Sequence, residues 1–472
     1  MGGRRAMGAV DAIWLSMDSP DNLMVIEGVM VLDGPVDWER LRAVVQHRLV
    51  ERYPVFRQVV VGPSTPMGMP HWEDDPDFSL EHHLHHATLP EPADEGAVQA
   101  FVEQRMQEPL DRSRPLWHFY LVDGHDGGSV VVSRFHHALA DGIALAQVLL
   151  SLTDEDVDGD LTRVTEPEPE PEPEPASASA SLLEVAGRAL RPVTGTVGAG
   201  VRSAVHLFGE IPELLHPAFA VEAVSTAWQA GQVADKLLLG HHPQFPLGTP
   251  PGPAKRAVWS QPRPLGDVKL VGRTAGATVN DVLVGAVSAA IGTYVSDRGA
   301  DPHDLSTMVP VNVRGGHPLP RELGNKFALV MLPLPTSPLA PLERLAETKR
   351  RMDSIKHSPE AVLTFGLIQA IGHTNTAVAK QVVDFFAGKA IGVTTNVAGP
   401  MTGRHLAGTR ITSILGWVPG SGRQTLGVCI FSYDGVVRVG FKADAAAVTD
   451  PEKLVLAFED ELDTLVRLAA AV

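Results

Sequence analysis

The stretch FHHALADG, residues 135–142, decides how this chain is interpreted. The apolar run before it, residues 129–135, is typical of a buried strand, and Ile143 to Leu152 has the composition of a short apolar helix. The two histidines therefore stand where a strand ends, and Asp141 and Gly142 make the turn into the helix. Loops held between rigid elements are where folds commonly present reactive side chains, so this turn is the candidate site.

Three kinds of site fit this pattern. His136, His137 and Asp141 are metal-ligand types, but adjacent side chains at a strand end point to opposite sides, and no HExxH pattern accompanies them. A structural histidine pair is the second possibility, and a general base beside a cavity is the third. The pattern HHxxxDG is expected by chance on the order of 0.01 times in a chain with 19 histidines, which favours the catalytic interpretation.

Composition sets the limits. A chain of 472 residues is long enough for two or three domains. Its 39 Lys and Arg against 56 Asp and Glu give a formal net charge of −17, which argues against general binding to nucleic-acid phosphates. The single cysteine, Cys429, lies in an apolar run and is expected to be a buried thiol. No run of about 18 apolar residues occurs, so no membrane-spanning helix is expected.

A Glu-Pro segment divides the chain. Residues 165–181, TEPEPEPEPEPASASAS, cannot form a helix or an inner strand, because proline lacks the amide donor and like charges extend the chain. We therefore expect an N-terminal half over residues 1–160, a linker with a helical crossover over 161–254, and a C-terminal half over 255–472. The locally basic, apolar stretch 182–209 fits either a helix lying on a membrane or one packed across two domains.

Both halves have a mixed α/β pattern. Strands are expected over residues 25–32, 117–123, 129–135, 305–313, 327–334, 391–397, 410–417, 426–433 and 436–443. Helices are expected over residues 38–50, 97–107, 143–152, 280–295 and 451–469.

Five ordered blocks resemble one family. HHxxxDG is the signature of the CoA-dependent acyltransferase superfamily, which also contains the condensation domains of peptide synthetases. The other blocks narrow the resemblance to the bacterial wax ester synthase/diacylglycerol acyltransferase family, over about residues 7–160 and 255–465. They are Pro115-Leu116-Trp117 (its PLW motif), Thr278-Val279-Asn280-Asp281 (its ND motif), Val309-Pro310-Val311-Asn312-Val313-Arg314 followed by Gly324-Asn325, and Asn396-Val397-Ala398-Gly399-Pro400, with Ala398 where proline is common.

The resemblance implies a two-domain α/β fold of the chloramphenicol acetyltransferase type, with the active site in a tunnel between the halves. It also implies an acyl-CoA-dependent O-acyltransferase that esterifies diacylglycerol to triacylglycerol, or long-chain alcohols to wax esters. Acyl transfer to an alcohol needs the hydroxyl proton removed, and histidine is well suited to this at neutral pH. The resemblance assigns that role to His137, without a covalent intermediate.

The resemblance also suggests roles for the other site residues. Asp141 is expected to pair with Arg314 and hold the loop, with Gly142 and Asp281 as further structural support. Asn280 is expected either to stabilise the oxyanion or to act only as a helix N-cap. His136 belongs to the site with its role open. Substrate-channel candidates are Pro115, Leu116, Trp117, Asn325 and Asn396, although an ordinary strand start explains the first three nearly as well.

No cofactor or metal is expected, since acyl-CoA is a substrate. The stretch FSLEHHLHH, residues 78–86, is dense in histidine, but the related family has a similar stretch, with Arg where His85 stands, and needs no metal. The expected partners are acyl-CoA and a lipid alcohol, at the cytoplasmic surface of a membrane or lipid droplet, and not nucleic acid. Two alternatives stay open: a condensation-like enzyme with a carrier-protein donor, and a non-catalytic lipid-binding protein of the same fold.

Overall fold

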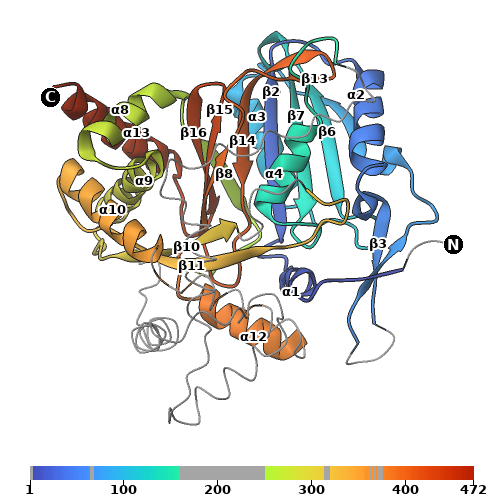
Figure 1. The fold of residues 1–472 in the computed structure, drawn as a ribbon, viewed down its shortest axis with the longest axis horizontal. Coiled ribbons are helices and arrows are strands. Elements are labelled where there is room, and N and C mark those ends of the chain that lie inside the picture. Colours follow the sequence, from blue (N-terminus) through green and yellow to red (C-terminus); the bar gives the residue numbers. More distant parts are fainter. Residues whose placement is uncertain are drawn as a thin grey trace, which may run out of the picture.

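In a computed structural model, the described part of the chain comprises residues 4–63, 68–159, 250–312, 319–356, 358, 360, 364, 368 and 376–471. The Glu-Pro segment, the basic stretch 182–209 and Arg314 lie outside these residues. Two large sheets stand side by side, with one group of helices on the outer face of the C-terminal sheet (Figure 1).

The first sheet contains most of the N-terminal strands. Its order is β13-β14-β2-β7-β6-β5, and the strands span His405–Leu406, Thr409–Trp417, Val25–Leu32, Ser129–His136, Trp117–Asp123 and Leu84–Thr88. The strands expected over 25–32, 117–123 and 129–135 are confirmed. Two of the six strands come from the far end of the chain: β14 pairs antiparallel with β2, with Gly416 opposite Gly28. This exchange ties the N-terminal sheet to the C-terminal region.

The second sheet belongs to the C-terminal region. Its order is β12-β15-β16-β8, with β9 also paired to β16, over Thr394–Ala398, Leu426–Tyr433, Val436–Asp444, Lys255–Trp259 and Arg263–Pro264. Four helices cover one face: α8 (Leu265–Ala275), α9 (Val279–Ser296), α10 (Pro341–Lys356) and α13 (Glu452–Ala470) (Figure 1). Among the described helices, only α9 is long and apolar enough to cross a membrane, and 78% of it is buried inside the fold, as in the core helix of a globular domain.

The remaining elements surround these sheets. They are β1 (Arg5–Ala6), α1 (Ala9–Met17), α2 (Trp38–Val44) with a π-helical turn over Val45–Val50, β3 (Gln58–Val61), β4 (His71–Asp74), α3 (Glu95–Met106), α4 (Gly142–Ser151), β10 (Leu305–Asn312), β11 (Phe327–Leu334) and α12 (Thr376–Ala387), with short 3-10 turns at Pro54–Arg57, Leu80–His82 and His125–Gly127. The antiparallel pair β10–β11 and the helices α1 and α12 lie below the two sheets in the view of Figure 1. These four elements matter because they border the site.

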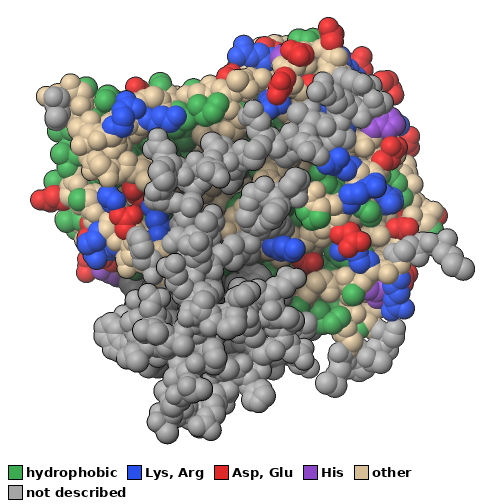
Figure 2. All heavy atoms as spheres, viewed as in Figure 1, with side chains coloured by type: hydrophobic (Ala, Val, Ile, Leu, Met, Phe, Trp, Pro, Cys, Tyr) green, Lys and Arg blue, Asp and Glu red, His purple; other side chains and the backbone are tan. Residues whose placement is uncertain are grey.

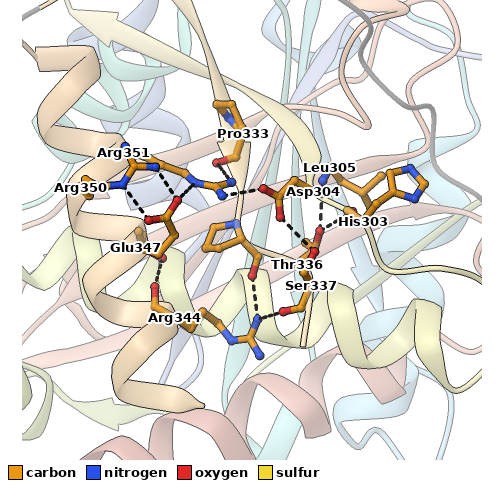
Figure 3. A network of polar contacts seen from close by, with 12 residues as sticks. His303, Asp304, Leu305, Pro333, Thr336, Ser337, Arg344, Glu347, Arg350 and Arg351 are labelled. Atoms are coloured by element: carbon orange, nitrogen blue, oxygen red, sulfur yellow. Dashed lines mark hydrogen bonds and ion pairs between the residues drawn. The ribbon is translucent and has the colours of Figure 1, made fainter. Parts of the chain in front are cut away.

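Arginines of α10 hold the β10–β11 pair in place (Figure 3). Arg344 Nη1 donates to the carbonyl of Pro335 at 2.7 Å, and Arg351 Nη1 donates to the carbonyl of Pro333 at 3.1 Å. Arg351 also pairs with Asp304, which stands just before β10, and with Glu347 of its own helix. The network therefore fixes the end of the strand pair that is remote from the site.

The sequence did not predict α1, α8, α10 or α12. Helix α10 shows why: its buried residues are Arg344, Leu345, Thr348 and Met352, so half of its inward stripe is polar and leaves no apolar periodicity to detect. On the described face in Figure 2, Lys and Arg side chains are interspersed with Asp and Glu, and no large patch of one sign is visible.

Candidate active site

His137 is the first residue after strand β7. Its backbone N–H donates to the carbonyl of Met24 at 2.7 Å, which extends the β2–β7 pairing by one residue. Its imidazole stacks on the indole of Trp14 from α1, with ring centroids 4.2 Å apart and an interplanar angle of 23°. The ring is thus held on one face by an aromatic side chain from a different part of the chain.

Asn325, which stands two residues before β11, holds the His137 ring in position through a hydrogen bond. Asn325 Oδ1 lies 2.9 Å from His137 Nδ1, and Asn325 Nδ2 donates to the His137 carbonyl at 2.8 Å. Asp11 holds Asn325 in turn: its Oδ1 accepts from the Asn325 Nδ2 at 2.8 Å and from the Asn325 backbone N–H at 2.9 Å. The contacts form a buried chain from carboxylate to amide to imidazole.

The Asp11–Asn325–His137 hydrogen bonds determine the tautomer of His137. Both partners of Asn325 Nδ2, a carbonyl and a carboxylate, accept hydrogen bonds, so the amide orientation is forced and Oδ1 faces the imidazole. An amide oxygen can only accept, so the proton of a neutral His137 sits on Nδ1. The lone pair is therefore on Nε2, the ring nitrogen left free to take a proton.

Burial also sets the charge of the ring. It lowers the pKa of His137 from its ordinary value near 6.5 to about 4, although the Asp141 carboxylate and the hydrogen bond with Asn325 act in the opposite direction. The imidazole is consequently neutral at pH 7. Burial raises the pKa of Asp11 in the same region, against the hydrogen bonds donated by Asn325.

Asp141 caps α4 and joins it to the segment that carries Asn325. Its Oδ1 accepts from the Ala144 N–H at 2.9 Å, and its Oδ2 accepts from the Lys326 N–H at 3.0 Å. The two ends of the site, β7–α4 and residues 325–326, are thereby locked to one another. The expected pairing with Arg314 falls outside the described residues.

His136 points away from His137. It is 1% exposed, its Nδ1 accepts from the Ala138 N–H at 3.0 Å, and its Nε2 lies 3.7 Å from Asp18 Oδ2. Asp18 accepts further hydrogen bonds from the Met24 N–H and from Arg112. These contacts hold the loop between α1 and β2, which carries the Met24 carbonyl that anchors His137.

A deep pocket of about 1270 Å³, part of it open to solvent, lies in front of His137. Its wall comes from both regions of the chain: Trp14 and Ile13 of α1 and Gly142 of α4 face Phe327 and Met331 of β11 and Phe386 of α12. Most lining side chains are apolar, and His137 and Asp141 are the ionisable groups among the described residues that line it. Such a pocket suits a lipid with one reactive polar group.

The ND motif lies elsewhere. Thr278 caps α9, and its hydroxyl and the Asp281 carboxylate form a reciprocal capping box, with 3.1 and 2.8 Å between partners. Asn280 Oδ1 accepts from Asn396 Nδ2 at 2.9 Å, which joins the ND motif to the block around residue 396. Neither asparagine is among the described residues that line the pocket, so the catalytic role of Asn280 and the channel role of Asn396 stay predictions.

The PLW motif begins strand β6 in the hydrophobic core. Leu116 and Trp117 are 0% exposed, and Trp117 Nε1 donates to the Phe56 carbonyl at 2.7 Å. Pro115 is buried beside them, and none of the three is among the described lining residues of the pocket. These contacts fit an ordinary strand start, and a channel role for the three residues stays a prediction.

One histidine of the stretch 78–86 packs on the same tryptophan, and two others have different partners. His83 stacks on Trp117, His85 Nε2 lies 2.9 Å from His118 Nδ1, and His86 pairs with Asp123. In the described part of the chain, no group of three or more His, Cys, Asp or Glu side chains has the arrangement of a metal site.

Asp11 and Trp14, which contact Asn325 and His137, were not predicted from the sequence. The one available signal was Asp11 itself, a carboxylate inside the apolar run AVDAIWL. Asn325 was expected only as a channel residue, and its contact with His137 spans 188 positions of sequence.

The fold is an α/β two-domain architecture that resembles known acyltransferases and condensation domains. The wax ester synthase/diacylglycerol acyltransferase from Marinobacter aquaeolei VT8 superposes with a TM-score of 0.66 at 19% identity, covering 99% of this chain and 100% of that chain. The first condensation domain of the calcium-dependent antibiotic synthetase superposes with a TM-score of 0.56 at 17% identity, covering 99% and 97%. These similarities define the fold.

The family follows from the sequence profiles. The wax ester synthase/diacylglycerol acyltransferase catalytic domain matches residues 7–283, and the WS/DGAT C-terminal domain matches residues 323–466. The chain belongs to the WS/DGAT family of acyltransferases. A Mycobacterium tuberculosis protein that carries the provisional name diacylglycerol O-acyltransferase is 29% identical to this chain over 503 aligned positions. The match covers 99% of this chain and 98% of that protein.

Proposed function

We propose that this acyltransferase transfers an acyl group from acyl-CoA to the hydroxyl of diacylglycerol, with long-chain alcohols as alternative acceptors. The observation that carries the proposal is the state of His137: a neutral imidazole, with its Nδ1 proton held by Asn325, at the wall of an apolar pocket. The names of the mycobacterial relatives support diacylglycerol as the acceptor.

The chemistry then follows in two steps. His137 Nε2 takes the acceptor hydroxyl proton while the hydroxyl oxygen attacks the thioester carbonyl, which forms a C–O bond and an oxyanion. The oxyanion collapses, the C–S bond breaks, and the imidazolium returns its proton to the CoA sulfur. Base catalysis of this kind contributes about 10²–10⁴-fold to the rate.

The surroundings of His137 support both charges that this reaction creates. The Asp141 carboxylate favours the imidazolium electrostatically. Gly142 and Ile143, the first two residues of α4, line the pocket, so the positive end of a helix dipole faces it and would stabilise an oxyanion formed there. The Asp11–Asn325 chain keeps the ring from rotating as its charge changes.

The test is CoA release from palmitoyl-CoA with dioleoylglycerol, with hexadecanol, or without acceptor. His86→Ala is the matched control for His137→Ala, because His86 is an exposed histidine paired with Asp123 and is remote from the pocket lining. We expect release that depends on the acceptor, full activity in His86→Ala, and loss of activity in His137→Ala. If the wild-type protein transferred an acyl group only from a carrier-bound thioester, and not from palmitoyl-CoA, the result would support the condensation-like alternative. Binding of lipid without any acyl transfer would support a lipid-binding protein.

Both substrates are amphiphiles, so we also propose that the enzyme works at the cytoplasmic surface of a membrane or lipid droplet. Co-sedimentation with vesicles that contain dioleoylglycerol is the measurement. Protein that stays in the supernatant at every lipid concentration would contradict this part of the proposal.

A further inference from the structure

A second cavity lies beneath helix α4, between the two sheets. Its empty space, part of it open to solvent, is about 630 Å³, against about 1270 Å³ for the His137 pocket. Its wall is formed mainly by apolar side chains, among them Ile26 of β2, Leu149 of α4, Ile414 of β14 and Phe431 of β15. None of the reaction steps described above uses this space.

The two cavities share part of their walls beside the site. Gly142, Thr395 and Val418 line both of them, and Gly142 directly follows Asp141 at the start of α4. A flexible chain attached to a group that reacts at His137 therefore has two directions to take. One leads into the large pocket, and the other leads under α4.

A pair of glycines makes room under α4. Gly28 and Gly416 lie opposite each other on β2 and β14. A Cβ on Gly416 would lie 3.5 Å from Cys429 Sγ, whereas a Cβ on Gly28 would lie 2.8 Å from Ser133 Oγ and 3.3 Å from Leu149 Cδ1. Because Cys429 lines the cavity, a side chain at position 416 would occupy part of its volume, whereas Gly28 also allows the close approach of Ser133. Neither glycine has a positive φ, so backbone conformation does not explain them.

The cavity wall carries no free charge in its described residues. Cys429 is a neutral thiol, because burial raises its pKa to about 12. Glu27 also lines the cavity, and its carboxylate is paired, with 3.0 Å between Glu27 Oε2 and Lys442 Nζ. A long ligand that fills this space must therefore be a hydrocarbon.

We infer that the cavity under α4 receives the acyl chain of the thioester donor, while the larger pocket receives the acceptor. This inference rests on the proposed function and assigns its two substrates to two cavities. The donor brings one unbranched chain, which suits the smaller space. Diacylglycerol brings two chains, which need the wider pocket in front of His137.

The assignment is tested by narrowing one cavity at a time. Gly416→Val narrows the cavity under α4, and valine is compatible with a strand. Leu329→Phe is the matched variant, because Leu329 lines only the large pocket. For each variant, kcat/KM is measured with octanoyl-CoA and palmitoyl-CoA at fixed dioleoylglycerol, and then with dioleoylglycerol and hexadecanol at fixed octanoyl-CoA.

We expect Gly416→Val to lower the palmitoyl-to-octanoyl ratio about tenfold or more, the scale on which a pocket discriminates chain length. Retained turnover of octanoyl-CoA shows that the variant is folded. Leu329→Phe should change the ratio of the two acceptors and leave the ratio of the two donors as it is. Leu149→Ala, which enlarges the same cavity, should shift the donor preference toward longer chains.

Two results would overturn the inference while the proposed function stands. One is a Gly416→Val enzyme that turns over with an unchanged donor ratio, and the other is a change in its acceptor ratio alone. Failure of the proposed function is a different result: wild-type protein would release no CoA with any pair of donor and acceptor.

Discussion

His137 and His83 have nearly the same local environment and yet differ in what they can do. Each stacks on a tryptophan, His137 on Trp14 at 4.2 Å and His83 on Trp117 at 4.6 Å. Each has its Nδ1 2.9 Å from an acceptor oxygen, that of Asn325 or of the Trp117 backbone. Burial lowers the pKa of both to about 4.

The difference is what lies beyond Nε2. His83 is 1% exposed, and its Nε2 is enclosed by the core around Trp117 and Phe78. His137 lines a large pocket. A lowered pKa and a fixed tautomer therefore do not make a catalytic base by themselves, because a substrate proton must also be able to reach the nitrogen.

The largest effect is expected for His137→Ala. Removing the base should lower kcat/KM for acceptor-dependent CoA release by about 10²–10⁴-fold, the range for a general base. The thermal midpoint, followed by circular dichroism, should stay close to that of wild type, since the ring borders a cavity. Full activity in a folded His137→Ala protein would contradict the assignment.

Asn325→Leu tests the fixed tautomer. Leucine keeps the approximate size but removes the acceptor of the Nδ1 proton, so the ring is free to rotate or to shift its proton. We expect kcat/KM to fall about 10²-fold, the scale of a misplaced catalytic group.

Nitrogen NMR of His137 separates this positioning role from a general loss of structure. The wild-type ring should show the Nδ1–H tautomer, and the variant should show a mixture. Asp11→Asn is the milder companion, because it weakens one of the two acceptors that orient Asn325 and leaves the other, the His137 carbonyl, in place. An Asn325→Leu variant that keeps the Nδ1–H tautomer of His137 would contradict the positioning role of Asn325.

His83→Ala should have the opposite phenotype. Truncating this buried ring leaves a cavity against Trp117, so we expect a loss of about 3 kcal/mol in the free energy of unfolding. Chemical denaturation measures the loss, and kcat/KM of the folded fraction should match that of wild type. A fall in activity without destabilisation would show that His83 belongs to the reaction.

The pH dependence gives the smallest effect. The rate kcat/KM should decline only as pH falls toward about 4, the pKa of His137, and not near 6.5. Stability behaves differently: between pH 6.5 and 4 the unfolded chain binds protons that the folded His137 and His83 do not, so the free energy of unfolding decreases as pH falls through this window. In His83→Ala this slope should be shallower, because one of the histidines whose pKa is lowered by burial is absent.

Much of the architecture could be predicted from local patterns. The strands β2, β6, β11 and β15 begin and end where apolar runs predicted them, because a strand is defined over a few neighbouring residues. Helix α10 could not be found in this way, since arginine and threonine occupy half of its buried stripe and their polar atoms bond to backbone carbonyls. The pairing of β14 with β2 was also invisible, because no local pattern specifies a partner several hundred residues away.

Local sequence patterns were enough to find the family signature, the position of His137 at the end of a strand, and the turn at Asp141. Which histidine borders a cavity, which of its nitrogens carries the proton, and which carboxylate supports the site depend on how distant segments pack. Hydrophobic periodicity reports only on residues that are close neighbours along the chain. The Asp11–Asn325–His137 contacts instead join positions up to 314 residues apart, and they exist only once the two sheets have packed.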